Sequence, residues 1–575
     1  MFKLSLRSAF RFSFVSYVSV KSLSTTSSKV VWFRDFALRI HDNVALSSAV
    51  LSNDAAIKTF IQPISLVVSP DLRTGGTARD VFALNALESL NQSLFGTLKL
   101  GMISSECPRD IASELIHACK SLNSNEIYYL KSQDDVFESE LEKILMENGL
   151  RPKTYHGSNT LLDYSTQIIP WKEIIFNDPW RSPLIPYVDF VIDKLEKNPA
   201  KPISSPKGLE TSLNKAHVTN ELFTNPVEVK SIQEMVGISS GGTRWGDRIS
   251  DQWPASEEKA LENLNHFLDA LEANQGEAKV THLASHLSPY LARGLLSPKV
   301  VYEQIQRRKD RINVSSILRR ICWRDYTMGV STLFPDVTKG IPIRSGYEAL
   351  EHGLDTIPKE EKARRLNAWK KGFTGFPLID AGMRQLDAEG WMPQKVRLAC
   401  ATFLVEGLGL SWRDGMQHFA EFLVDFDPAI NSNMWQNAGL VGFDPYYVGM
   451  NFKRRSYWDK DGDYIRKWVP ELHNLPDFVE VPCKTGHKSV DCLYEPWMAP
   501  ESVLVENEIV LGSSYPNRIC NERETRSLFF AAARSIRKSW SDGKIDDRKR
   551  DLISIGIDDE SVGMFTPRAI QLPHY

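Results

Sequence analysis

Several features that mark large classes of protein are missing from this sequence. The seven cysteines include no Cys-X-X-Cys pair, and the cluster of Cys483, His487 and Cys492 shows no fourth ligand. We therefore predict reduced thiols in an intracellular protein and no metal site. A Gly-X-Gly-X-X-Gly loop is also missing, which gives no support to a dinucleotide site built on such a loop. The formal net charge is only −3, so the chain as a whole does not indicate nucleic-acid binding.

Acidic residues are missing from the start of the chain, and the first one is Asp35. Residues 1–28 are rich in serine, and lysines and arginines interrupt their apolar residues. No membrane span is long enough there, and we expect no membrane partner. The composition is typical of an organelle transit peptide, which predicts a mitochondrial or chloroplast location. The alternatives are a disordered basic arm or a mistaken start codon, and either would leave the protein in the cytoplasm or nucleus.

Residues 29–160 alternate between short apolar runs and helical patterns. This alternation predicts a doubly wound parallel β-sheet covered by helices. The expected strands are Val30–Phe33, Ile64–Val68 and Ile127–Leu130, and the expected helices are Val81–Leu94, Asp110–Leu122 and Val136–Asn148. Residues 161–250 are rich in proline, serine, lysine and asparagine, which is typical of a long connector.

Residues 251–530 have apolar positions at helical spacing, as in Ala260–Leu271. This pattern predicts an all-α second domain. Residues 531–575 are polar and mixed in charge, so we expect a C-terminal tail. Within the helical domain, Ser285 and Ser288 lie at the start of a helix led by Pro289. Hydroxyls and free backbone N–H groups at a helix start favour an anion site.

A second helix start is formed by Asp427, which is followed by a proline. The carboxylate is a good N-cap, and the helix should end near Gly439. Asn431 and Trp435 follow Asp427 at intervals of four, so the three side chains share one face. One interpretation is that Asp427 only caps, Asn431 is exposed and Trp435 packs. The other is a binding face for a flat heteroaromatic ring.

Two long segments resemble the photolyase/cryptochrome family: DFDPAINSNMWQN, from Asp425, and WKKGFTGFPLIDAGMRQLDAEGWMPQKVRL, from Trp369. The resemblance extends from Val30 to about Arg526. It implies an N-terminal α/β domain of the kind that can hold an antenna chromophore, followed by an all-α domain that holds FAD. Whether this chain binds an antenna, of folate or deazaflavin type, stays open.

The resemblance also implies which residues hold FAD. The diphosphate-binding segment corresponds to Ser285, His286, Leu287 and Ser288, with His286 where the family often has arginine or lysine. The segment beside the flavin corresponds to Trp323, Arg324 and Asp325. The remaining positions implied are Arg397, Asp425, Asp427 and Asn431. Arg397 lies in an otherwise apolar helix, Val396–Leu408, so it needs a partner, and we expect Asp425 to pair with it.

Family members reduce light-excited flavin through a chain of tryptophans. Trp435 matches the member closest to the flavin, and Trp412 matches the middle one. The outer member would fall near Lys359, where no tryptophan stands. The chain could end early, or Trp369 or a tyrosine could substitute. Asn431 matches the residue next to flavin N5, and an amide is a poor proton donor.

Three positions depart from the known repair enzymes. Arg320 stands where enzymes that repair cyclobutane dimers have a glutamate, and we expect its long side chain to occupy the substrate pocket. Gln394 and Leu398 stand where those enzymes have asparagine and methionine, and where (6-4) photolyases have histidines. An arginine cannot serve as a proton source at neutral pH, and the acid–base groups for a (6-4) lesion are missing.

These departures favour an FAD-binding blue-light photoreceptor of cryptochrome type, with a signalling partner still to be identified, over an enzyme. One alternative is a light-dependent DNA photolyase acting on pyrimidine dimers, as in the DASH branch on single-stranded DNA. LVDFD and GDYIRKWVPEL resemble that branch. A further alternative is a flavoprotein that acts by partner binding without useful photochemistry.

Overall fold

The computed structural model describes most of the chain after the leader. The described residues are 27–52, 59–68, 77–132, 134–156, 159–162, 169–170, 174, 184–213, 222–235, 245–273, 284–350, 353–443, 452–453, 455, 459–483, 486–540, 551–554 and 561–564. The predicted transit peptide lies outside these ranges apart from its last two residues, so it stays a prediction. No helix in the described part of the chain is long and apolar enough to cross a bilayer.

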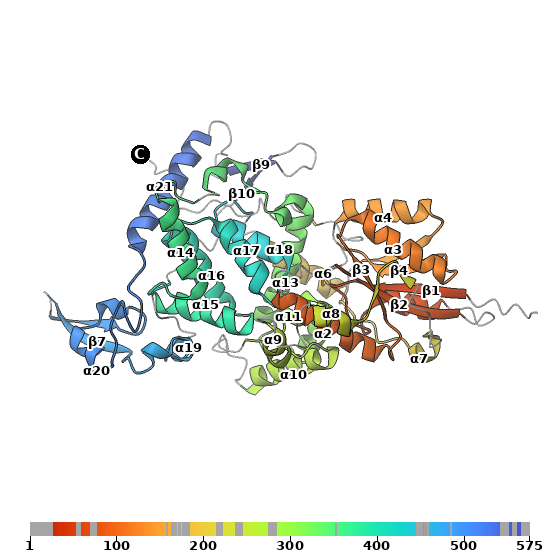
Figure 1. Cartoon of the computed structure of the whole chain (residues 1–575), viewed down its shortest axis with the longest axis horizontal. Helices are drawn as coiled ribbons and strands as arrows, with labels where there is room; N and C mark the ends of the chain where they lie inside the picture. The colour runs from red at the N-terminus through yellow and green to blue at the C-terminus, as the bar shows by residue number, and fades with distance from the viewer. Residues whose placement is uncertain are drawn as a thin grey trace, which may run out of the picture.

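The N-terminal part is a six-stranded sheet with helices on both faces, which confirms the doubly wound α/β domain (Figure 1). The strand order is β5-β4-β1-β2-β3-β6, and every pair is parallel except β3 with β6. The strands are β1 (Ser27–Phe33), β2 (Thr59–Val68), β3 (Lys99–Ile103), β4 (Glu126–Leu130), β5 (Arg151–Tyr155) and β6 (Pro226–Val227). The helices between them are α1 (Val44–Leu51), α2 (Ala78–Ser93), α3 (Pro108–Ser121) and α4 (Asp135–Glu147).

The two faces of the sheet belong to separate apolar clusters. Val30 and Trp32 of β1 pack on one face, and Val31 and Phe33 pack on the other. This follows from the alternation of side chains along a strand. The sequence patterns did not predict β3 or β5, and β5 is an edge strand of mostly polar residues.

The predicted connector contains helices α6 (Leu184–Lys197), α7 (Leu209–Ser212) and α8 (Val229–Met235). The helical domain follows. Its helices are α9 (Gly246–Gln252), α10 (Glu257–Ala273), α11 (Ser288–Ala292), α12 (Pro298–Gln306), α13 (Val314–Leu333), α14 (Lys359–Lys371), α15 (Pro377–Glu389), α16 (Gln394–Thr402), α17 (Trp412–Phe422), α18 (Pro428–Ala438), α19 (Asp463–Trp468), α20 (Glu501–Glu506) and α21 (Glu522–Trp540).

Two β-hairpins accompany these helices. One is formed by β7 (Phe478–Cys483) and β8 (Gly486–Asp491), and the other by β9 (Asp551–Ser554) and β10 (Ser561–Met564). The second hairpin lies in the predicted tail, and the boundary predicted at residue 530 falls inside α21. The predicted helix 396–408 is α16 continued by a π-helical turn, η5 (Phe403–Gly407).

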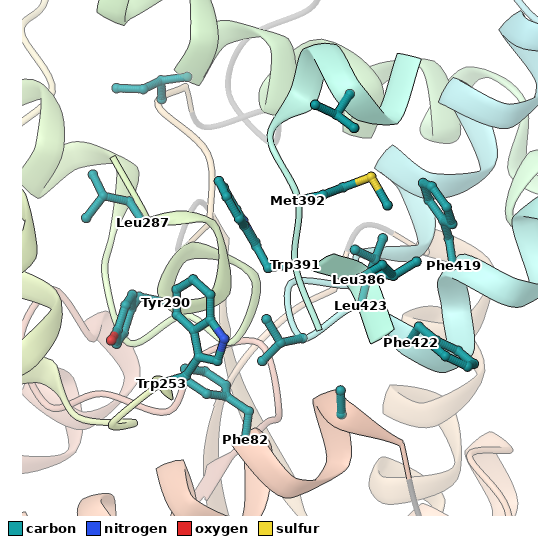
Figure 2. Close-up of a cluster of buried hydrophobic side chains, with 14 of the residues drawn as sticks. Phe82, Trp253, Leu287, Tyr290, Leu386, Trp391, Met392, Phe419, Phe422 and Leu423 are labelled. Atoms are coloured by element: carbon teal, nitrogen blue, oxygen red, sulfur yellow. The ribbon is translucent and has the colours of Figure 1, made fainter. Parts of the chain in front are cut away.

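The loop after β1 holds the two domains together. Arg39 is fully buried and donates from Nη1 to the carbonyl oxygen of Gly294 at 2.7 Å. Asp35 accepts from Arg293 at 2.9 Å. Helix α2 adds an apolar contact, because the Phe82 ring lies 5.6 Å from the Tyr290 ring. Figure 2 shows this cluster continuing from α2 to α11 and α17. The helical domain is therefore packed directly against the sheet domain.

Candidate functional site

A cavity between α16, α17 and α18 brings together seven of the residues predicted from the sequence: Gln394, Arg397, Leu398, Asp425, Asp427, Asn431 and Trp435. The other lining residues are Ala401, Phe419, Leu423, Phe426, Ile430 and Met434. The wall is therefore mostly apolar and aromatic, with a few fixed polar groups. Ligand sites for flat organic molecules have this composition.

Helix α18 supplies one wall of the cavity, and its local structure agrees with the sequence prediction. Asp427 is the N-cap and accepts from the backbone N–H of Ile430 at 3.1 Å, and Gly439 is the C-cap. Asn431 is 7% exposed and donates from Nδ2 to the Met416 carbonyl at 3.1 Å. The interpretation in which Asn431 is exposed is therefore wrong. Asp427, Asn431 and Trp435 all line the same cavity.

The expected pair of Arg397 and Asp425 is present. Nη1 and Nη2 of Arg397 donate to the two carboxylate oxygens of Asp425 at 3.0 and 2.8 Å. Nε of Arg397 donates to the Met392 carbonyl at 2.9 Å. A bidentate pair of this kind is strong and fixes the orientation of both groups. The cavity wall thus carries a carboxylate and a guanidinium that neutralise each other.

A second ion pair, not predicted from the sequence, joins α13 to α18. Nη1 of Arg324 lies 3.0 Å from Oδ2 of Asp427 in an ion pair, and both side chains are buried. Nε and Nη2 of Arg324 are buried without a partner among the residues that the structure describes. Buried N–H groups are normally satisfied. Two donors on one guanidinium fit an anionic oxygen, such as that of the FAD diphosphate.

A second buried arginine, Arg39, is coupled to Arg324. Burial lowers the pKa of Arg39, the charges of Asp42 and Glu257 raise it, and the charge of Arg324 lowers it. Arg39 is paired with Asp42 at 3.8 Å, and Arg324 is paired with Asp427 at 3.0 Å. Each guanidinium group thus has a carboxylate partner, and neither arginine lines the cavity.

The segment Ser285–Ser288 is built differently from the expected anion site. Leu287, not a serine, is the N-cap residue of α11, and it makes no side-chain cap bond. The Ser288 hydroxyl accepts from Nε1 of Trp391 at 3.1 Å. Ser285 and His286 line a separate cavity on the α10 side. Nothing in the geometry tests whether this segment binds phosphate, and its role stays a prediction.

His286 has a left-handed backbone, with φ of 51°. Its ring lies 4.7 Å from the Trp391 ring and 5.6 Å from the Trp253 ring. Burial lowers the pKa of His286. A neutral imidazole packed between indoles at neutral pH does not replace the cation that the family often carries at this position.

The expected position of Arg320 in the pocket is wrong. Arg320 is exposed and does not line the cavity. A guanidinium is buried only when it has a partner, and Asp425 and Asp427 are already paired with Arg397 and Arg324. Arg320 is therefore left in solvent.

The neighbours of Arg324 do not line the cavity either. Trp323 packs 5.4 Å from the Tyr326 ring. Asp325 is buried and accepts from the backbone N–H of Leu161 at 2.7 Å. This bond ties the start of the connector to α13, which is a structural contact that the sequence did not reveal.

Three tryptophans are buried around α17 and α18: Trp369, Trp412 and Trp435, which are 0%, 1% and 2% exposed. The packing of two of them requires glycine. A Cβ at Gly415 would lie 2.1 Å from Cη2 of Trp435, and a Cβ at Gly439 would lie 2.5 Å from Cδ1 of Trp412. The glycines therefore let α17 and α18 approach closely around the indoles.

Trp369 lies beside the innermost tryptophan, not at the outer end of the chain. Its ring is 6.2 Å from the Trp435 ring in an edge-on arrangement, and it stacks on Phe419 at 6.1 Å. Its Nε1 donates to the Cys400 carbonyl at 3.1 Å. The sequence suggested Trp369 only as a substitute for the outer member. The contact between Trp369 and Trp435 could not be predicted from the sequence, because the two residues lie far apart along the chain.

Known proteins resemble the chain in both domains. Residues 317–535 match the family model described as the FAD binding domain of DNA photolyase. Deoxyribodipyrimidine photo-lyase from Alkalihalophilus pseudofirmus is 34% identical over 288 residues, which are 48% of this chain and 56% of that protein. Cryptochrome-1 from Erithacus rubecula is 28% identical over 536 residues, which are 89% of this chain and 78% of that protein.

The same relationship holds in three dimensions. The crystal structure of a bacterial class III photolyase from Agrobacterium tumefaciens superposes with a TM-score of 0.71 at 25% identity, covering 90% of this chain and all of that one. The predicted cofactor is confirmed as FAD, which the helical domain binds. With an α/β domain packed on an all-α FAD-binding domain, and with photolyases and cryptochromes as its relatives, the chain belongs to the photolyase/cryptochrome family.

Proposed function

We propose that the protein is a blue-light photoreceptor of cryptochrome type, in which light drives electron transfer from its own tryptophans to FAD. The observation that carries this proposal is the state of the cavity. Both carboxylates that line it, Asp425 and Asp427, are committed to ion pairs with arginines. Gln394 and Leu398 complete the wall. Among the lining residues, none is thus left to act as an acid or a base on a damaged base.

Bound FAD would absorb the light and accept the electron. The residues of this chain that would hold it are Arg397 and Asp425 along the ring, Asn431 at its edge, and Arg324 at the diphosphate. Trp435 lines the cavity, so its indole is the donor closest to the ring. Trp412 and Trp369 then supply the next electron. The amide at Asn431 holds hydrogen bonds but delivers no proton at neutral pH.

A matched pair of variants tests the proposal. Purified protein should release yellow FAD on heating or acidification, because no covalent link is expected. Blue light should bleach the oxidised flavin band of the native protein. Trp435→Phe should slow this bleaching at least about tenfold, whereas Trp468→Phe should leave it unchanged, since Trp468 packs under Lys467 and does not line the cavity. Bleaching of the Trp435→Phe variant at the native rate would refute the proposal.

Light-dependent DNA repair is the second candidate. It is favoured by the relative named deoxyribodipyrimidine photo-lyase. In this chain, Arg319 and Arg320 are both exposed on α13 and could contact phosphates. The test is illumination with dimer-containing single-stranded and duplex oligonucleotides. Catalytic turnover would establish a photolyase, and a native protein that bleaches under light without repairing either substrate would support the photoreceptor.

Partner and location remain separate proposals. We expect a signalling protein as the partner, since a photoreceptor must pass its state on. We also expect residues 1–28 to direct the chain to an organelle. A fusion of these residues to a fluorescent protein tests the second point, and cytoplasmic or nuclear fluorescence would contradict it.

A further inference from the structure

Trp412, one of the three buried tryptophans, lies under a positive charge. The guanidinium carbon of Arg413 is 4.8 Å from the centre of the Trp412 ring. The ring is only 1% exposed, so it lies in the low-dielectric interior. A cation over the face of an indole attracts the neutral ring, and this attraction is stronger where water is excluded. The neutral form of Trp412 is therefore stabilised in the resting protein.

Packing fixes both the guanidinium group and the ring. Gly340 is the C-cap of the short helix η3 (Pro335–Lys339), and a Cβ at this glycine would lie 3.0 Å from Nη1 of Arg413. A larger residue there would press on the arginine. The Trp412 ring is held against the end of α18, since a Cβ at Gly439 would lie 2.5 Å from its Cδ1. The cation and the ring therefore keep one arrangement.

The start of α17 acts on Trp412 with the same sign. Trp412 and Arg413 are the first two residues of this helix. A helix N-terminus carries a partial positive charge, which disfavours a basic residue in the first turn. The charges of Lys362 and Lys370 on α14 act on Asp414, the acidic residue of this turn. Its negative charge is thus offset by two other cations, and the electrostatic environment of Trp412 opposes a further positive charge.

Oxidised Trp412 also lacks a nearby group that could take its proton. Its Nε1 is buried and has no hydrogen-bond partner among the residues that the structure describes. By comparison, Nε1 of Trp369 donates to the Cys400 carbonyl at 3.1 Å. A Trp412 that has lost an electron therefore keeps its N–H proton and its full positive charge. That charge and the guanidinium charge, 4.8 Å away, repel each other.

We propose that Arg413 controls how long an electron vacancy stays on Trp412, and thereby how much reduced flavin each absorbed photon yields. This inference rests on the proposed function, in which Trp435 gives an electron to light-excited FAD. Trp412 then gives one electron to oxidised Trp435, which becomes neutral, and Trp412 becomes a radical cation that keeps its N–H bond. In this step Arg413 changes from an attracting to a repelling neighbour. The vacancy is thus driven back to Trp435, where it recombines with the electron on FAD.

Transient absorption after a blue flash measures the lifetime of the tryptophan radical cation in the FAD-loaded protein. Arg413→Gln and Arg413→Met both remove the charge, and the second variant covers a folding failure of the first. Each should lengthen this lifetime at least about tenfold and raise the yield of reduced flavin. Arg413→Lys keeps the charge and should stay close to the native lifetime, which distinguishes charge from packing.

Two controls locate the effect. Arg518→Gln is the matched variant, because Arg518 also lies 4.8 Å from an indole, that of Trp497, which does not line the cavity. This variant should keep the native lifetime. In a Trp412→Phe background, Arg413→Gln should leave the lifetime of the remaining radical unchanged, since the proposed effect acts through the Trp412 ring.

The outcomes separate the inference from the proposed function. If the flavin band of the native protein does not bleach under steady blue light, the proposed function fails and the inference fails with it. If the band bleaches but the uncharged variants keep the native lifetime, only the role of Arg413 is overturned. Equal lengthening in Arg413→Lys, or in the Trp412→Phe background, would overturn it as well, because the effect would then come from packing or from another residue.

Discussion

The contact between Gly415 and Trp435 permits a quantitative test of the packing around the innermost tryptophan. A Cβ at position 415 would lie 2.1 Å from Cη2 and 2.3 Å from Cζ3 of Trp435, and 2.7 Å from Cδ2 of Leu404. Such contacts cannot exist, so Gly415→Ala must push the indole or separate α17 from α18. Overpacking of a core costs about 1–3 kcal/mol, and alanine recovers up to about 1 kcal/mol of helix propensity.

The net loss in Gly415→Ala should therefore be up to about 2 kcal/mol, which lowers the melting temperature of the helical domain by up to about 8 °C. The two closest of these atoms belong to the outer ring of the indole, which a phenyl ring lacks. In a Trp435→Phe background, Gly415→Ala should accordingly cost less, because only the contact with the end of the flexible Leu404 side chain remains. The coupling between the two changes should be at least about 1 kcal/mol.

Scanning calorimetry of the four proteins, each with excess FAD, measures this coupling. The bleaching rate under blue light gives a second readout, since a displaced indole should donate more slowly. Equal losses for Gly415→Ala with either residue at position 435 would refute the reasoning, because the cost would then come from somewhere other than the indole.

Three further predictions concern charged groups. Asp425→Asn leaves Arg397 without its counter-charge, so it should destabilise the protein by about 3–5 kcal/mol and weaken FAD retention, as measured by calorimetry and by filtration. Repair of cyclobutane dimers in duplex DNA should be absent or very weak. Arg320→Glu should not restore repair, because residue 320 is exposed and does not line the cavity. Turnover of a dimer-containing oligonucleotide by the Arg320→Glu variant would contradict this prediction. Glu361 has its pKa lowered to about 2 by hydrogen bonds from Arg364 and then from Arg365. Because the pKa is lowered in the folded state, ionised Glu361 stabilises the protein above the ordinary pKa of 4.5, and this stabilisation is lost as the pH falls towards 2. Glu361→Gln should therefore lower the melting temperature at neutral pH. It should lower the melting temperature by a smaller amount between pH 4.5 and pH 2.

Features with a short range along the chain were predictable from the sequence. The cap at Asp427, the face shared by Asn431 and Trp435, and the helix end at Gly439 all depend on residues within about three turns of one another. The alternation of side chains in β1 is local in the same sense. The pair of Arg397 and Asp425 was also within reach, because a charged residue in an apolar helix requires a partner.

Contacts between distant residues were not predictable in this way. Trp369 packs against Trp435, and Tyr347 donates a hydrogen bond to Asp551, which lies 204 residues further along the chain. Periodicity shows only that such a residue has a buried face. It does not show which residue covers that face, since packing of whole helices decides this. The short polar strand β5 escaped prediction for a related reason: it is an edge strand stabilised mainly by its backbone pairing with β4.

The error at Arg320 shows how one missed partner changes a functional argument. From the sequence, only the pair of Arg397 and Asp425 was predicted, and nothing in the spacing assigned a partner to Asp427. The structure gives Asp425 to Arg397 and Asp427 to Arg324. Once both carboxylates are taken, desolvating a third guanidinium would gain no charge partner in the cavity, so Arg320 stays in solvent. The argument against dimer repair therefore rests on Gln394 and Leu398 in the wall and on the ion pairs that occupy both cavity carboxylates, and not on an arginine that blocks the cavity.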